Sequence, residues 1–268
     1  MLSLRKYATS IALDWQAVFA YRASAVIWML VDAVPSFTMI LIWLAVYRER
    51  DAIGGFSLTE MVTYYLCATI LSVVLTPHPE YGVRDEVRLG KLSQALLKPI
   101  SRFWQILLGE TAWQGMKALM SAPVFLIGIW LVRAHVEWPD LSHGRWPALL
   151  AAVACAYALA IFMKMALALL SFWVIDLHGV VIAYETTAMV FQGELVPLSL
   201  LPDWVQSVGR FLPFRFVIAE PIAILQGRLD APQAWLDAGS AALWALALLG
   251  IAWALWRRGL RTYGAVGG

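Results

Sequence analysis

Long apolar runs alternate with shorter polar stretches along most of this chain. Six runs have the roughly 17–25 residues that an α-helix needs to cross the hydrocarbon core of a bilayer. They are 24–47, 58–76, 106–132, 147–175, 179–196 and 234–256. The pattern predicts an all-α integral membrane protein with six transmembrane helices.

The first 22 residues follow a different pattern. At helical period, Leu4, Ile11, Trp15, Val18 and Phe19 share one face, and polar side chains lie mostly elsewhere. This arrangement is typical of a helix in the membrane interface, and the alternative is a frayed leader. We expect no cleaved signal peptide, because polar residues interrupt the apolar stretch and no small-residue cleavage site follows.

The segment 79–105, between the second and third runs, is rich in charge. Lysines and arginines near the ends of the runs favour a cytoplasmic position for this segment and for both termini. Val83, Val87 and Leu92 are expected to form an apolar ridge, with a charged rim as in a protein–protein contact. The rim would consist of Arg84, Asp85, Glu86 and Arg88. The alternative is a solvated loop whose basic residues only keep this segment on the cytoplasmic side of the membrane.

The segment 197–227, before the last run, is too apolar for an aqueous loop. Four prolines break it too often for a spanning helix. They are Pro197, Pro202, Pro213 and Pro221. We expect short helical pieces that form a re-entrant hairpin in the outer leaflet, at a pathway or its outer gate. The alternative is an interfacial loop anchored by its aromatic side chains.

Composition supports a membrane protein. The chain is 61% hydrophobic and 14% charged, whereas soluble domains are about 45–50% apolar and about 25% charged. The net charge of +2 does not indicate a nucleic-acid partner. Cys67 and Cys155 fall inside apolar runs and form neither a metal motif nor a disulfide framework.

Six charged side chains fall inside the predicted spans. They are Asp32, Glu110, Lys117, Lys164, Glu185 and Glu194. Such residues are costly in lipid and should face a bundle interior, a cavity or each other. Glu110 and Lys117 share a helix face. Lys164 is expected nearer the cytoplasmic end, where it can snorkel to the membrane surface.

The sequence contains no strong catalytic motif. Gly90–Lys91 lacks the other residues of a phosphate-binding loop, and no metalloprotease, nucleophile-elbow or Cys-x-x-Cys pattern occurs. Asp176 and His178 are two residues apart and do not share a helix face. The chain is therefore expected to be a non-catalytic transport subunit, with no cofactor of its own.

Three stretches resemble the permease subunits of type-2 ATP-binding cassette exporters, the ABC-2 family, and more narrowly its small bacterial permeases. They are GKLSQALLKPI (Gly90–Ile100), LPFRFVIAEPIAILQG (Leu212–Gly227) and WRRGLRTYGAVGG (Trp256–Gly268). The layout is also similar: an interfacial helix, six spans, a cytoplasmic segment after span two and a re-entrant hairpin before span six. The resemblance covers essentially the whole chain.

The resemblance implies a multi-pass protein of the bacterial inner membrane with several partners. Two ABC ATP-binding subunits would carry ATP and Mg, and a second permease chain, identical or related, would complete the pathway. The segment 79–105 would be the coupling segment, with Arg84, Asp85, Glu86, Val87 and Arg88 contacting the ATPase. Spans one, two and five would line the route, which makes Asp32 and Glu185 the candidate pathway residues.

The substrate class and the energy source remain open at this point. Fourteen tryptophans and other aromatic residues, together with two candidate acids, suit a hydrophobic, cationic or lipid-like compound. Tryptophan also accumulates at membrane boundaries without any ligand. The rival hypotheses are a secondary transporter, for which no internal repeat is evident, and a membrane enzyme, for which no cluster of catalytic residues is evident.

Overall fold

The computed structural model describes residues 2–20, 22–136 and 145–264, and these residues are almost entirely helical. The all-α class is thus confirmed. The longest helices are α1 (Leu2–Ala20), α2 (Arg22–Val46), α3 (Leu58–Leu75), α6 (Arg102–Val132), α7 (Arg145–Leu169) and α11 (Ala231–Thr262). The shorter elements are β1 (Ala52–Ile53), β2 (Phe56–Ser57), α4 (Pro79–Arg88), α5 (Lys91–Leu96), α8 (His178–Phe191), α9 (Asp203–Phe211) and α10 (Ala219–Leu225).

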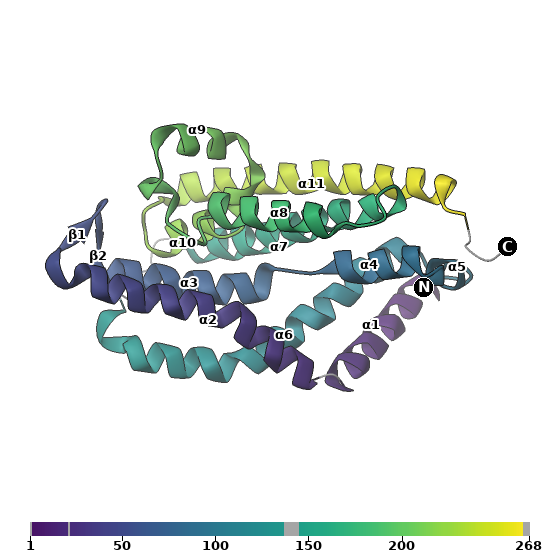
Figure 1. The fold of residues 1–268 in the computed structure, drawn as a ribbon, viewed down its shortest axis with the longest axis horizontal. Helices are drawn as coiled ribbons and strands as arrows, with labels where there is room; N and C mark the ends of the chain where they lie inside the picture. The colour runs from purple at the N-terminus through teal and green to yellow at the C-terminus, as the bar shows by residue number, and fades with distance from the viewer. Residues whose placement is uncertain (1, 21, 137–144, 265–268) are drawn as a thin grey trace.

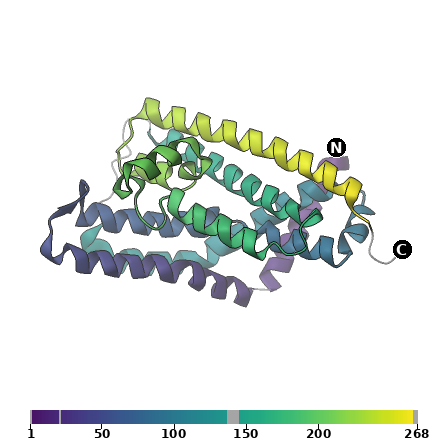
Figure 2. The same ribbon diagram turned by 45° about the horizontal axis from the view of Figure 1, so that its top comes forward.

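The long helices lie side by side in an elongated bundle (Figure 1). Helices α7 and α11 make the most extensive contact, and α2 packs along α3. The turned view keeps α7 and α11 adjacent (Figure 2). One end of the bundle carries α4, α5, the start of α1 and the end of α11, and the opposite end carries the β-hairpin, α9 and α10 (Figure 1).

Four stretches of the described chain are long and apolar enough to cross a membrane. They are Leu58–Arg88, Arg102–His135, Arg145–Phe172 and Ala231–Thr262. They correspond to the predicted second, third, fourth and sixth spans. The 25-residue helix α2 occupies the predicted first span but is not among the four.

The predicted fifth span, 179–196, does not form one continuous crossing. Helix α8 has 14 residues, a length of about 21 Å at 1.5 Å per residue, against a hydrocarbon core of about 30 Å. The chain turns at Gly193, whose φ is 78°. The hydroxyls of Tyr64 and Tyr65 donate to the carbonyl oxygens of Gly193 and Leu195, at 2.6 and 2.7 Å. These bonds tie the turn to α3 and thus fix the end of α8.

The proline-rich segment 197–227 forms the expected short helical pieces. Helix α9 is amphipathic and leaves Trp204 and Phe211 exposed, whereas α10 buries Ile222 and Ile224 in the bundle. The two short helices therefore differ in environment. Re-entry of this segment into the outer leaflet remains a prediction.

The N-terminal segment is helical, as expected, and packs against α6. A Cβ atom placed on Gly115 of α6 would lie 2.7 Å from the ring of Trp15. The indole of Trp15 therefore packs directly against the backbone of α6 at this glycine. This close approach fixes the angle at which α1 crosses the bundle. Its position in a membrane interface remains a prediction.

The charged segment folds as α4 and α5, joined through Gly90 with φ of 71°. Val83 and Leu92 are buried in one cluster with Phe103, Met165 and Trp256. The prediction that Val83, Val87 and Leu92 form an exposed apolar ridge is therefore wrong. Because α4 lies along α7, its apolar face is covered by the bundle itself, and Val87 is half-buried against the same cluster.

Candidate functional site

The helical path is interrupted between α3 and α4, at Thr76–Pro77–His78 (Figure 1). Pro77 and Pro79 have no backbone N–H and cannot continue the hydrogen-bond ladder of α3. The backbone N–H of His78 instead donates to Glu110 Oε2 on α6, at 3.0 Å. Since this break falls within an apolar stretch that could span a membrane, its freed polar groups must be satisfied by neighbouring helices. Broken helices of this kind often mark transport sites.

Lys164 of α7 lies beside the break and is only 2% exposed. Its Nζ donates to Glu80 Oε1 in the first turn of α4, at 3.1 Å, and also to Glu185 Oε1 on α8. The ammonium lies 5.2 Å from the ring centroid of Tyr184, within reach of a cation–π contact. Three helices, α4, α7 and α8, therefore converge on one buried positive charge.

Glu80 is the central carboxylate of this cluster. Its Oε1 also lies 3.0 Å from His78 Nδ1, while its Oε2 is buried and has no hydrogen-bond partner among the described residues. Glu185 differs, because 41% of its side chain is exposed. We call the group formed by His78, Glu80, Lys164 and Glu185 the lysine cluster.

Three members of the lysine cluster have atoms that could hold a metal ion. Ligand atoms of His78, Glu80 and Glu185 lie within 4.8 Å of one another. However, the ammonium of Lys164 already bonds to both carboxylates. A metal ion would have to displace it, so the arrangement fits an internal ion pair better than a metal centre.

The structure brings only one of the two predicted pathway residues into the lysine cluster, namely Glu185. The side chain of Asp32 lies outside the described residues, although its helix α2 is described. The expectation that Lys164 snorkels is wrong, because two carboxylates hold it in the interior. Glu110 accepts the His78 N–H, and Glu194 accepts from Ser72 Oγ at 3.0 Å. The sequence did not single out His78 or Glu80, although the Pro-His-Pro break was visible.

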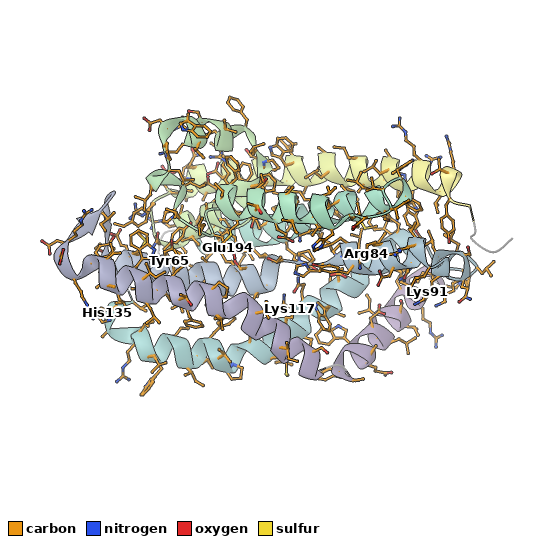
Figure 3. The ribbon with its side chains drawn as sticks, in the orientation of Figure 1. Tyr65, Arg84, Lys91, Lys117, His135 and Glu194 are labelled. Carbon is orange, nitrogen blue, oxygen red and sulfur yellow. The ribbon has the colours of Figure 1, made fainter. Side chains whose placement is uncertain are left out.

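The predicted coupling residues have separate roles on α4. Arg84 bonds to the adjacent Asp85 at 3.2 Å, and Arg88 is exposed. Glu86 forms an ion pair within the chain, because Arg102 of α6 donates to both of its carboxylate oxygens. The labelled Arg84 and Lys91 lie at the end of the bundle opposite His135 (Figure 3).

Apolar side chains other than those expected are exposed on this end. Tyr81, Leu89, Leu96 and Leu97 point away from the core, and Leu97 is 86% exposed. They lie among Arg84, Asp85, Arg88 and Lys91, on α4 and α5 or directly after the ends of these two helices. We call these eight residues the α4–α5 surface. The sequence signal was present for α4, since the helical period separates Tyr81 and Leu89 from Val83 and Val87.

Comparison with known families decides the class of this protein. Residues 33–267 match the model of the ABC-2 family transporter proteins. The chain belongs to the ABC-2 family. Neither a curated protein nor a solved structure matches it significantly. Membership implies that this ABC-2 family protein is an ABC permease, and its long apolar helices are consistent with a multi-pass membrane protein.

Proposed function

We propose that this chain is the permease subunit of an ABC exporter and forms half of a substrate pathway. Family membership is the observation that carries the proposal. ATP and Mg bind to separate ATP-binding subunits, two per transporter, and the permease itself is not catalytic. The transporter lies in the bacterial inner membrane with both termini in the cytoplasm, in agreement with the distribution of lysine and arginine.

The α4–α5 surface is the proposed contact with the ATP-binding subunit. Exposed apolar residues interspersed with charges of both signs are typical of a protein interface. The surface lies at the same end as the start of α1 and the end of α11 (Figure 1), the end assigned to the cytoplasm. Tyr81 is its most suitable anchor by residue type, because tyrosine is enriched among the residues that give most of the affinity of such contacts, and Leu97 is its most exposed apolar side chain.

A second permease, identical or related, covers the face that carries α8. Ile182 and Met189 of α8 are exposed apolar side chains and flank Glu185 one turn away on either side. The substrate pathway would run along this face, which places Glu185 beside it and gives Asp32 of α2 the same proposed role. A hydrophobic, cationic or lipid-like compound fits this lining.

Copurification tests the coupling contact. The tagged permease is coexpressed with the ATP-binding protein that this proposal expects to be encoded beside it, and the bound ATP-binding subunit is measured per permease in detergent. Leu97→Glu should sharply reduce this ratio. Phe211→Glu is the matched control, because Phe211 is 81% exposed at the opposite end of the bundle, and it should leave the ratio unchanged.

Two outcomes would contradict parts of this proposal. Equal ratios for both variants would remove the α4–α5 surface from the contact. The absence of any copurifying ATP-binding subunit, combined with transport driven by a proton gradient, would favour the alternative of a secondary transporter.

A further inference from the structure

The lysine cluster connects an accessible carboxylate to a buried one. Glu185 is partly exposed on α8, whereas Glu80 is 1% exposed and lies in the first turn of α4. Both carboxylates accept hydrogen bonds from the same Nζ atom of Lys164. The ammonium of Lys164 therefore bonds to carboxylates on two helices, α4 and α8. A ligand that binds Glu185 would change how Lys164 is shared between these two carboxylates.

Glu80 has the capacity to accept Lys164 completely. Its Oε2 atom is buried and has no partner in the described structure. An ammonium has three donors and can bond to both oxygens of one carboxylate. If Lys164 lost Glu185 as a partner, it would therefore remain paired with Glu80. Its freed N–H donor could then bond to Glu80 Oε2, an acceptor that is otherwise unused.

We propose that the cationic group of a substrate binds Glu185 in exchange for Lys164, and that Lys164 then pairs with Glu80 alone. This inference rests on the proposed function, because Glu80 belongs to the helix that carries the contact with the ATP-binding subunit. Occupation of the pathway thereby changes the ion pair at the start of α4. Substrate binding and ATP hydrolysis are linked through one shared lysine.

The surroundings of Glu185 define the class of substrate. Ile182 and Met189 lie exposed on the same helix face. A carboxylate between apolar side chains selects a cation with apolar substituents. The expected substrate is an amphipathic amine or another lipophilic cation, rather than a metal ion or a neutral lipid.

The test uses the complete transporter, permease with ATP-binding subunit, in lipid nanodiscs. The probe is tetraphenylphosphonium, and triphenylphosphine oxide is the neutral comparison. Binding and the stimulation of ATP hydrolysis above the unstimulated rate are measured separately. The phosphonium should bind and stimulate the unmodified transporter, and the neutral compound should not. Glu185→Gln should weaken binding by about tenfold, as expected for the loss of the Coulomb attraction between one carboxylate and one cation near a protein surface.

The decisive variant combines Lys164→Met with Glu80→Gln. It removes both members of the buried pair and leaves Glu185 without a competing ammonium. The phosphonium should then bind more tightly than to the unmodified transporter, yet stimulation should be lost. If Lys164 were only a structural residue, binding would not improve. Asp176→Asn is the matched control, since Asp176 is an exposed carboxylate at the start of α8 whose Oδ1 accepts the His178 N–H.

Several results would overturn the exchange. They are failure of the phosphonium to stimulate the unmodified transporter, equal effects of the neutral compound, unchanged binding in Glu185→Gln, and weaker binding in the double variant. The proposed function fails separately, if no ATP-binding subunit copurifies with the unmodified permease. The two hypotheses are therefore tested by different measurements.

Discussion

Lys164 and Glu80 are separated by 84 positions in the chain, yet the lysine Nζ lies 3.1 Å from Oε1 of the glutamate. Both side chains are almost fully buried. The pair joins α7 to the start of α4, immediately after the break in the apolar helix. Removal of one partner of a buried ion pair destabilises a protein much more than replacement of both partners does.

This asymmetry gives the first prediction. Lys164→Met leaves Glu80 buried without its cationic partner and should destabilise the protein by about 3–5 kcal/mol. The double variant with Glu80→Gln should recover part of that loss, because no unpaired charge remains. Chemical denaturation in detergent, followed by circular dichroism, measures both values. Equal stabilities of the single and double variants would contradict the burial of this pair.

The second prediction concerns Glu86 and Arg102. Glu86→Lys places two cations together between α4 and α6, where the structure has a bidentate ion pair. The amount of copurified ATP-binding subunit should fall, because the position of α4 is disturbed. The exchange of both charges, Glu86→Lys with Arg102→Glu, should restore it. No recovery in the exchanged variant would instead indicate that Glu86 contacts the partner directly.

The third prediction tests the packing of α1 on α6. Gly115→Ala should destabilise the protein by about 1–3 kcal/mol, since the new methyl group would collide with Trp15. Gly239→Ala on α11 is the control, because a Cβ there meets nothing within 4 Å. It should be neutral or stabilise by up to about 1 kcal/mol. Similar effects at the two positions would exclude the close approach of Trp15.

The fourth prediction concerns accessibility at the end of the bundle opposite the α4–α5 surface. In a background with Cys67 and Cys155 replaced by alanine, Asp203→Cys should react with a membrane-impermeant thiol reagent added outside. Ile218→Cys should react slowly, because Ile218 is 0% exposed. Reaction of intact cells, quantified by mass shift, gives both rates. Fast labelling at both positions would mean that the segment 197–227 is an open loop.

The fifth prediction is a pH dependence at Glu220 of α10. Burial is the main cause that raises the pKa of this carboxyl group to about 7. The positive charge of Arg215 lowers the pKa, and the negative charge of Asp237 raises it further. A raised carboxyl pKa means that the folded protein binds the proton more tightly than the unfolded chain. The contribution of Glu220 to stability is therefore full below pH 4.5 and lost as the pH rises towards about 7.

Glu220→Gln should remove this dependence. The melting temperature of the unmodified protein, relative to the variant, should decrease across the window from pH 4.5 to about 7. Parallel curves for the two proteins would show that Glu220 titrates normally. Glu49→Gln, at an exposed position outside the bundle core, is the matched control for the loss of one carboxyl group.

The class of this protein follows from local sequence properties. Continuous apolar runs of membrane-spanning length require helices, because each backbone polar group in lipid must be satisfied within its own segment. For that reason the predicted second, third, fourth and sixth spans coincide with the four long apolar stretches of the structure. Prolines likewise indicated the short pieces of the segment 197–227.

The composition of the lysine cluster depended on tertiary structure. Lys164, Glu80 and Glu185 lie in three different helices, and helical period does not reveal which faces meet across a bundle. Apolar helices in lipid have weak preferences for rotation, and the small and polar residues at their contacts determine how they pack. The sequence therefore identified Lys164 and Glu185 as costly charges, while only packing joined them to Glu80.

The same reason explains the inversion of the coupling helix. The apolar ridge expected of Val83, Val87 and Leu92 could face either a partner or the chain itself. Contact of α4 with α7 buries Val83, Leu92 of α5 joins the same buried cluster, and Tyr81, Leu89 and Leu97 remain exposed. Periodicity thus defined two faces of α4, and the position of α7 decided which of them is turned towards the solvent.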